Sequence, residues 1–160
     1  MTTIIFESPL GLVQVTGDEA GVSAISCVNV SADEPVSASI PEPVSQAVQQ
    51  LADYFAGTRK TFDFLINPAG TTFQQTVWKA LLNVPFGTTL SYLALTRRIG
   101  DEKAIRAVAA ANGKNPLWIV VPCHRIIGSD GSLTGYSGGL WRKKWLLEHE
   151  RGGTGQLVLF

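Results

Sequence analysis

The sequence predicts an α+β protein: a small antiparallel sheet with one helix, followed by a mostly helical domain with a helix-turn-helix and a candidate active-site loop. Apolar and polar residues alternate between glycine turns in the first part, which is typical of antiparallel strands. Apolar residues at helical spacing dominate the second part. Residues 1–67 carry two basic and eight acidic side chains (net −6), whereas residues 68–160 carry eleven basic and five acidic (net +6). We therefore expect an N-terminal domain at 1–67, a second domain at 68–151 that suits an anionic partner, and a tail at 152–160.

Composition restricts the chain to a globular class. Of its 160 residues, 45% are hydrophobic and 16% are charged, which is enough apolar material for a buried core. No apolar run approaches the roughly 18 residues of a membrane span, and the first residues lack the basic start of a signal peptide, so we expect a cytoplasmic protein with no membrane partner. Cys27 and Cys123 are then free thiols. The two Cys and two His are not clustered, so no metal site is expected.

Turn residues divide the first domain into short elements. Residues 8–11 and 17–21 are turn signals between apolar runs. Gly57 ends a run with helical spacing, and residues 67–70 are the best candidate for a domain boundary because the charge changes there. We expect strands at residues 3–6, 12–16 and 22–30, a polar loop at 31–43, a helix at 45–56 and an edge strand at 61–65.

The second domain is expected to begin with a helix that packs in the core. Thr72 and Gln75 match a capping box at its start. Five large apolar side chains follow at helical spacing, and burial preference places them in the core rather than on a binding surface. They are Phe73, Val77, Trp78, Leu81 and Leu82.

A pair of helices follows. Ser91 and Gly100 are the start and stop signals of a short helix, and Asp101 can cap a second helix that ends near residues 112–113. Two helices joined through one glycine suggest a helix-turn-helix, although two-helix hairpins are also common in proteins that bind no DNA.

The second helix of this pair has almost no side-chain bulk, because five of its residues are alanines. They are Ala104, Ala107, Ala109, Ala110 and Ala111. A slim helix can approach a duplex closely, and the isolated Arg106 would then reach into a groove or a base stack. The alternative is a surface helix with an unpaired arginine.

One short stretch carries the reactive side chains. Residues 119–121 are β-branched, which is typical of a buried strand, and Pro122 ends regular pairing just before Cys123. His124 and Arg125 follow at once, and positive charge beside a cysteine is expected to lower the pKa of its thiol. By itself, the apolar run would also suit a buried structural cysteine.

Two loops and a helix complete the second domain. Glycines at residues 128–131 and 135–139 predict a tight turn and a flexible loop, and residues 140–150 have the apolar spacing of a helix. The basic residues 142–144 form either a phosphate-facing patch or the solvated side of that helix.

Several short motifs occur together in the second half of the chain. They are FQQTVW at 73–78, PFGTT at 85–89, SY at 91–92, RAV at 106–108, KNP at 114–116, PCHRIIG at 122–128, GYSGG at 135–139 and WLLEHE at 145–150. This ordered set resembles the O6-alkylguanine-DNA alkyltransferase family over residues 72–151, about half of the chain. The first domain resembles the family only in size and in its sheet-plus-helix pattern.

The resemblance implies a nucleophilic cysteine. Cys123 would attack the alkyl carbon on guanine O6 and keep the group as a thioether, so that each molecule acts once and needs no cofactor. His124 would be the base, acting through a water, and Glu150 would orient it, as in a nucleophile–base–orienter triad. Asn115 would brace the turn around the thiol.

The resemblance also implies the contacts to the base. Tyr92 would donate a proton or a hydrogen bond to the leaving guanine, and the backbone N–H of Ser137 would donate another. The carbonyls of Cys123 and Ile126 would accept from the exocyclic amine. Tyr136 and Gly138 would complete the pocket, and O4-alkylthymine is expected as a second substrate.

The implied partner is double-stranded DNA, bound through the minor groove with the alkylguanine flipped out of the duplex. Arg106 would fill the gap that the base leaves, and the small residues Ala107, Ala109 and Ala110 would lie against the groove. Family members often carry glycine where this chain has Ala109 or Ala110. We expect a monomer that could cluster on DNA.

Three alternatives stay open beside this hypothesis. A non-catalytic lesion-binding relative carries tryptophan in place of the cysteine, so Cys123 argues against it. A thiol hydrolase would use Cys123 with His124, but adjacent residues usually point apart, and the Arg106 helix would have no role. A helix-turn-helix regulator would leave Cys123, His124 and Glu150 without a purpose.

Overall fold

The computed structural model describes residues 1–29 and 39–152. The chain divides into two compact units, Met1–Ala69 and Gly70–Phe160. Most of the loop expected at 31–43, the last residue of the third strand expected at 22–30 and the apolar end of the tail lie outside the described residues. Within the described parts of the chain, no helix combines the length and the apolar character needed to cross a membrane.

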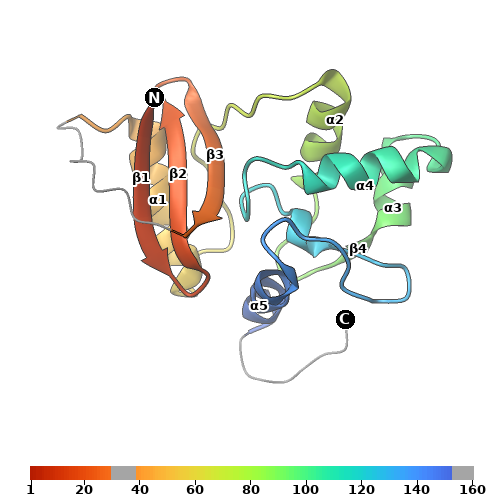
Figure 1. Ribbon diagram of the computed structural model, residues 1–160. Coiled ribbons are helices and arrows are strands. Elements are labelled where there is room, and N and C mark those ends of the chain that lie inside the picture. The colour runs from red at the N-terminus through yellow and green to blue at the C-terminus, as the bar shows by residue number, and fades with distance from the viewer. Residues whose placement is uncertain (30–38, 153–160) are drawn as a thin grey trace. The chain divides into compact units, whose positions relative to one another are not determined.

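The first unit is a three-stranded antiparallel sheet, in the order β1-β2-β3, with helix α1 against one face (Figure 1). Its elements are β1 (Thr2–Ser8), β2 (Gly11–Asp18), β3 (Gly21–Val28) and α1 (Glu42–Phe55). Val13 and Val15 alternate on the buried face of β2, and Val44 and Leu51 face them from the helix side of the core. The three expected strands and the helix are confirmed.

The prediction of an edge strand at residues 61–65 is wrong. Among the described residues, this segment makes a single bridge to the sheet, between Val22 and Ile66. The N–H of Val22 donates to the carbonyl of Leu65 at 2.9 Å, and the N–H of Asn67 donates to the carbonyl of Val22 at 2.7 Å. Gly21, with φ of 136°, permits this approach, because a Cβ there would lie 2.9 Å from the backbone of Ile66.

The second unit is mostly helical (Figure 1). Its helices are α2 (Thr72–Leu81), α3 (Tyr92–Ile99), α4 (Ile105–Gly113) and α5 (Leu140–Glu150), with the short 3₁₀ turns η1 (Glu102–Ala104) and η2 (Cys123–Arg125). A two-residue parallel pair joins β4 (Leu90–Ser91) to β5 (Ile126–Ile127). This pair ties the entrance of α3 to the segment that follows the cysteine.

Helix α2 begins one residue earlier than expected. Thr71 is the N-cap: its hydroxyl accepts from the N–H of Gln74 at 3.1 Å, and the Gln74 side chain accepts from the N–H of Thr71 at 2.9 Å. Thr72 already belongs to the helix. Phe73 and Leu82 were expected in the core but are 38% and 47% exposed, because they lie in the first turn and just beyond the last turn.

The expected helix pair is confirmed. The hydroxyl of Ser91 caps α3 by accepting from the N–H of Ala94 at 3.0 Å, and α3 ends at Gly100. Asp101 caps η1, which continues into α4. The indole N–H of Trp78 donates to the carbonyl of Ala111 at 2.9 Å, so α2 holds the end of α4 in place.

Candidate active site

The segment before Cys123 is buried but is not the strand that its β-branched residues suggest. Residues 117–121 turn tightly: the N–H of Val120 donates to the carbonyl of Trp118 at 2.8 Å, and the N–H of Val121 donates to the carbonyl of Leu117 at 3.0 Å. Ile119 lies at the centre of the first turn with φ of +75°, a strained conformation for a β-branched residue. Ile119 lies four residues before Cys123. Backbone strain of this kind often occurs at functional sites.

Asn115 supplies the hydrogen bonds that hold this turn. Its Nδ2 donates to the carbonyls of Val121 at 2.8 Å and Leu117 at 3.3 Å, and its Oδ1 accepts from the N–H of Leu117 at 2.9 Å. The Asn115 side chain is 4% exposed. The side-chain amide of Asn115 therefore forms hydrogen bonds with backbone groups of this apolar run, which in a strand would pair with a neighbouring strand.

Cys123 opens the 3₁₀ turn η2 and is 5% exposed. Burial raises the pKa of its thiol to about 11, and this effect exceeds the opposing hydrogen bond of Asn115 and the charge of Lys143. The expectation that the flanking His124 and Arg125 lower this pKa is therefore wrong. The resting thiol is protonated, and a base is needed to activate it.

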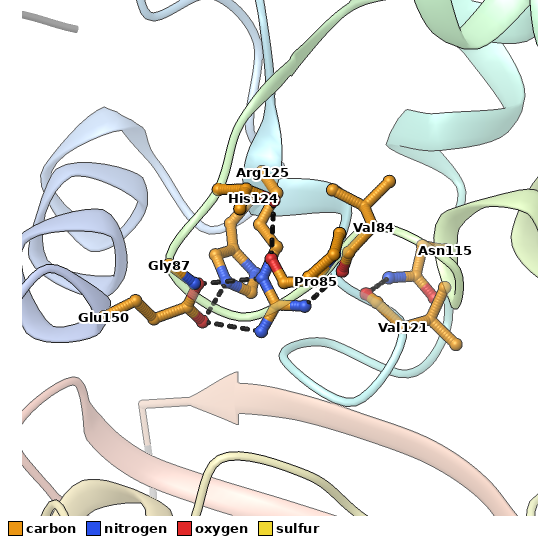
Figure 2. Close-up of polar contacts among 9 residues, drawn as sticks. Val84, Pro85, Gly87, Asn115, Val121, His124, Arg125 and Glu150 are labelled. Carbon is orange, nitrogen blue, oxygen red and sulfur yellow. Dashed lines mark hydrogen bonds and ion pairs between the residues drawn. The ribbon is translucent and has the colours of Figure 1, made fainter.

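A buried ion-pair network follows the cysteine (Figure 2). Nε2 of His124 lies 2.7 Å from Oε2 of Glu150. Arg125 donates from Nε to Oε1 of Glu150 at 2.8 Å and from Nη2 to Oε2 at 3.0 Å. Arg125 also donates from Nη1 to the carbonyl of Val84 at 2.7 Å, and the N–H of Gly87 reaches Oε1 of Glu150 at 3.4 Å. Helix α5 thus supplies the carboxylate around which the turn η2 is built.

The electrostatics of this network assign the protonation states. Burial lowers the pKa of His124, which outweighs the opposing effect of Glu150. Burial raises the pKa of Glu150, but His124 and Arg125 together bring it far below its usual range. Glu150 is therefore a carboxylate, and a neutral His124 must donate to it from Nε2. The basic nitrogen is then Nδ1 of His124, which has no hydrogen-bond partner among the described residues.

Lys143 is a site residue that sequence reasoning missed. The sequence predicts that residues 142–144 form either a phosphate-facing patch or the solvated side of the helix, yet the side chain of Lys143 is fully buried. Its ammonium donates to the carbonyls of Ile126 at 2.5 Å and Thr134 at 2.9 Å. Burial lowers its pKa to about 8, and Cys123 opposes this shift. Position 143 shares a helical face with Leu146 and Glu150, a spacing that indicates burial.

A cavity of about 660 Å³ lies between α3, α4 and the loop that precedes α5. Its lining residues are Tyr92, Ile105, Arg106, Ala109, Asn112, Gly113, Thr134, Gly135, Tyr136 and Ser137. Burial raises the pKa of Tyr92, and Cys123 raises it further, so the thiol lies near this wall of the cavity. The hydroxyl of Ser137 donates to the carbonyl of Gly113 at 2.7 Å and joins the two walls.

Four of the residues predicted to contact DNA or to form the substrate pocket do not line this cavity, and neither do Cys123, His124, Asn115 and Glu150. Ala107 and Ala110 are on the exposed side of α4, and Ile126 is buried in β5. Gly138 is buried beside Trp118, and a Cβ there would lie 2.8 Å from this indole. Among residues 1–29 and 39–152, no three His, Cys, Asp or Glu side chains cluster as metal ligands would.

Comparison with known proteins decides the family. The protein-family model described as "6-O-methylguanine DNA methyltransferase, DNA binding domain" matches residues 72–152. The model for the ribonuclease-like domain of the same methyltransferase matches residues 1–68. The chain belongs to the 6-O-methylguanine DNA methyltransferase family. The resemblance inferred from the motifs is therefore confirmed.

Relatives match along almost the whole chain. A methylated-DNA–protein-cysteine methyltransferase of Methanosarcina acetivorans is 44% identical over 149 residues, covering 91% of this chain and 96% of the relative. The crystal structure of the O6-methylguanine methyltransferase of Mycobacterium tuberculosis is 40% identical, with a TM-score of 0.82 over 98% of this chain and 96% of that chain. A structure of OGT from the same organism in complex with DNA is 44% identical, with a TM-score of 0.81 over 92% and 91% of the two chains. The α+β fold is thus confirmed.

Proposed function

We propose that this chain reverses DNA damage by moving the alkyl group of an O6-alkylguanine to Cys123. One observation carries the proposal: a buried thiol is followed directly by the His124–Glu150–Arg125 network and lies near a cavity that contains Tyr92. Membership of the methyltransferase family and the similarity to a DNA-bound relative support the same reaction. The protein is a single-turnover methylated-DNA–protein-cysteine methyltransferase.

Activation of the thiol is the first step. With a pKa of about 11, only about one Cys123 in ten thousand is ionised at pH 7. Nδ1 of the neutral His124 takes the thiol proton through a water, while Glu150 holds the other ring nitrogen. Arg125 balances the charge of Glu150, so that the carboxylate does not need His124 to be protonated. Asn115 holds the turn that presents the thiol.

Transfer follows as a displacement at carbon. The thiolate of Cys123 forms a bond to the alkyl carbon, the bond from that carbon to guanine O6 breaks, and the electron pair stays on the guanine. Tyr92 and the backbone N–H of Ser137 stabilise the guanine anion, which then takes up a proton to become normal guanine. The thioether does not hydrolyse, so the protein is consumed and needs no cofactor.

Access to the base requires that it leave the duplex. Arg106 is exposed and also lines the cavity, so it lies at the boundary between the outer face of α4 and the pocket. The exposed Ala107 and Ala110 leave that face slim enough to enter the minor groove. Arg106 then fills the gap in the base stack. The same pocket accepts O4-alkylthymine as a second substrate. The protein acts in the cytoplasm. It is a monomer that can cluster on DNA.

Transfer of a labelled methyl group tests this proposal. A duplex with one labelled O6-methylguanine is mixed with excess and with limiting protein, and protein-bound label is followed over time. We expect a plateau of one methyl group per protein, none with Cys123→Ser, and a slower approach to the same plateau with Arg106→Ala. Label that exceeds one methyl per protein, or an undiminished signal with Cys123→Ser, would overturn the proposal.

A further inference from the structure

Lys143 is a buried charged residue that the reaction described above does not use. Its side chain is fully buried in α5, and its ammonium donates to the carbonyls of Ile126 at 2.5 Å and Thr134 at 2.9 Å. Lysine is almost never fully buried unless its charge is paired or hydrogen-bonded. An apolar side chain would fill the same space without the cost of burying a charge. The two hydrogen bonds of the ammonium therefore point to a role beyond packing.

The carbonyl of Thr134 is shared by Lys143 and Tyr92. The hydroxyl of Tyr92 donates to this carbonyl at 3.2 Å, and the ammonium of Lys143 lies 5.8 Å from the centroid of the Tyr92 ring. Tyr92 and Thr134 both line the cavity, and Thr134 is exposed in the loop that precedes α5. A hydroxyl that is held by a loop carbonyl is placed only as precisely as that carbonyl. Lys143 supplies the contact from the core that holds it.

Lys143 also connects this loop to the start of α3. Its second acceptor, Ile126, pairs with Leu90 in the parallel pair of β4 and β5. Tyr92 begins α3 directly after β4, two residues beyond Leu90. The contacts thus form a closed ring that runs from Tyr92 through Thr134, Lys143 and Ile126 back to β4. This ring fixes the carbonyl of Thr134 relative to the backbone that carries Tyr92.

We propose that Lys143 is a positioning residue for Tyr92: its ammonium fixes the Thr134 carbonyl, which holds the Tyr92 hydroxyl at the cavity wall until it donates to the leaving guanine. When the hydroxyl turns from Thr134 to the base, the carbonyl keeps its hydrogen bond from Lys143, so the turn leaves fewer groups unpaired. This inference rests on the proposed function, because it requires that Tyr92 donate to a guanine.

The test must separate this role from the effect of Lys143 on the thiol. The charge of Lys143 also lowers the pKa of Cys123, so its loss affects the nucleophile as well. Iodoacetamide alkylates the thiol with no guanine as leaving group, and its rate constant therefore reports on the thiol alone. We define the transfer ratio as the rate constant of methyl transfer from O6-methylguanine in a duplex, divided by the rate constant of alkylation by iodoacetamide.

The transfer ratio is measured in a Cys27→Ser background, so that only one thiol reacts. Lys143→Met and Lys143→Arg are each compared with their parent, with and without Tyr92→Phe. Lys144→Met is the matched control, because Lys144 is the next residue of α5 and its side chain is 56% exposed. Methyl transfer is followed in a single turnover at saturating protein. Rate constants rather than amplitudes are compared, so that partial loss of folded protein does not change the result.

We expect Lys143→Met to lower the transfer ratio about fivefold, the effect of one hydrogen bond. Lys143→Arg should lower it much less, because a guanidinium can still donate to both carbonyls, and Lys144→Met should leave it unchanged. Tyr92→Phe should lower the ratio by itself. In that background, Lys143→Met should lower it no further, since the hydroxyl that Lys143 positions is gone.

Three results would overturn the inference. One is an unchanged transfer ratio in Lys143→Met, which would limit Lys143 to its effect on the thiol. Another is an equal loss from Lys143→Met with and without Tyr92→Phe, which would show that Lys143 does not act through Tyr92. The third is a Tyr92→Phe protein with the ratio of its parent. Absence of methyl transfer to the parent protein would instead contradict the proposed function.

Discussion

Arg125 contacts both carboxylate oxygens of Glu150 inside the protein, at 2.8 Å and 3.0 Å. The two side chains are 7% and 1% exposed, so each charge depends on the other for its stability. Because burial lowers the pKa of His124, its contact with Glu150 is a hydrogen bond from a neutral ring rather than an ion pair. Burial is the main cause that keeps His124 neutral, and the charge of Arg125 acts in the same direction.

Loss of the carboxylate should destabilise the fold. Glu150→Gln leaves the buried guanidinium of Arg125 without a counter-charge, and we expect the free energy of unfolding in denaturant to fall by about 3–5 kcal/mol. Glu148→Gln is the matched control, because Glu148 forms an exposed contact of 4.0 Å with Lys144 and should change stability by less than about 1 kcal/mol. Equal effects of the two substitutions would contradict the importance of the buried pair.

The charge of Lys143 should tune the thiol. We expect Lys143→Met to slow alkylation of Cys123 by iodoacetamide several-fold near neutral pH and to move the pH profile upward, because Lys143 lowers the pKa of Cys123. Lys143→Arg should keep much of the wild-type profile. Both are measured in a Cys27→Ser background, so that only one thiol reacts. If the pH profiles of alkylation for Lys143→Met and Lys143→Arg coincide, Lys143 has only a packing role at the thiol.

Stability should depend on the thiol at high pH. Burial raises the pKa of Cys123 from an ordinary 9.0 to about 11, so the folded state keeps a proton that the unfolded state has lost. The stabilisation is complete below pH 9 and is lost as the pH rises to about 11. Relative to Cys123→Ser, wild type should lose about 2–3 kcal/mol of unfolding free energy across this range, measured by denaturant titration. A constant difference between the two proteins would show that burial does not raise the pKa.

Gly138 should tolerate no side chain. A Cβ at this position would lie 2.8 Å from the rings of both Trp118 and Tyr136. We expect Gly138→Ala to cost about 1–3 kcal/mol of stability in thermal unfolding and to slow alkyl transfer, since Tyr136 lines the cavity. Gly100→Ala is the control, because nothing lies within 4 Å of its Cβ position. A wild-type transfer rate and wild-type stability in Gly138→Ala would contradict this packing.

Local chemistry explains what the sequence predicts well. Ser91 and Gly100 mark the ends of α3 because capping depends on neighbouring residues alone. The order Cys123-His124 is visible in the sequence, and Glu150 was assigned through the motifs around it. These features do not depend on how distant segments pack.

Other features depend on partners that lie far along the chain. Residues 119–121 look like a strand because strands and buried turns both use β-branched residues, and only the hydrogen bonds of Asn115 decide between them. Lys143 looks solvated because lysine is almost never fully buried. The pKa of Cys123 rises because burial is a property of the whole fold, whereas the charges beside it in sequence suggested the opposite.

The central claim is that Cys123 is the acceptor of the alkyl group. The most direct measurement is intact mass followed by peptide mapping after incubation with a duplex that contains one O6-methylguanine. The chain offers an internal control, since Cys27 is its other cysteine. We expect one added methyl group on the peptide that contains Cys123, none on the peptide that contains Cys27, and no added mass in Cys123→Ser. A methyl group on any other residue, or demethylated DNA with an unmodified protein, would contradict the claim.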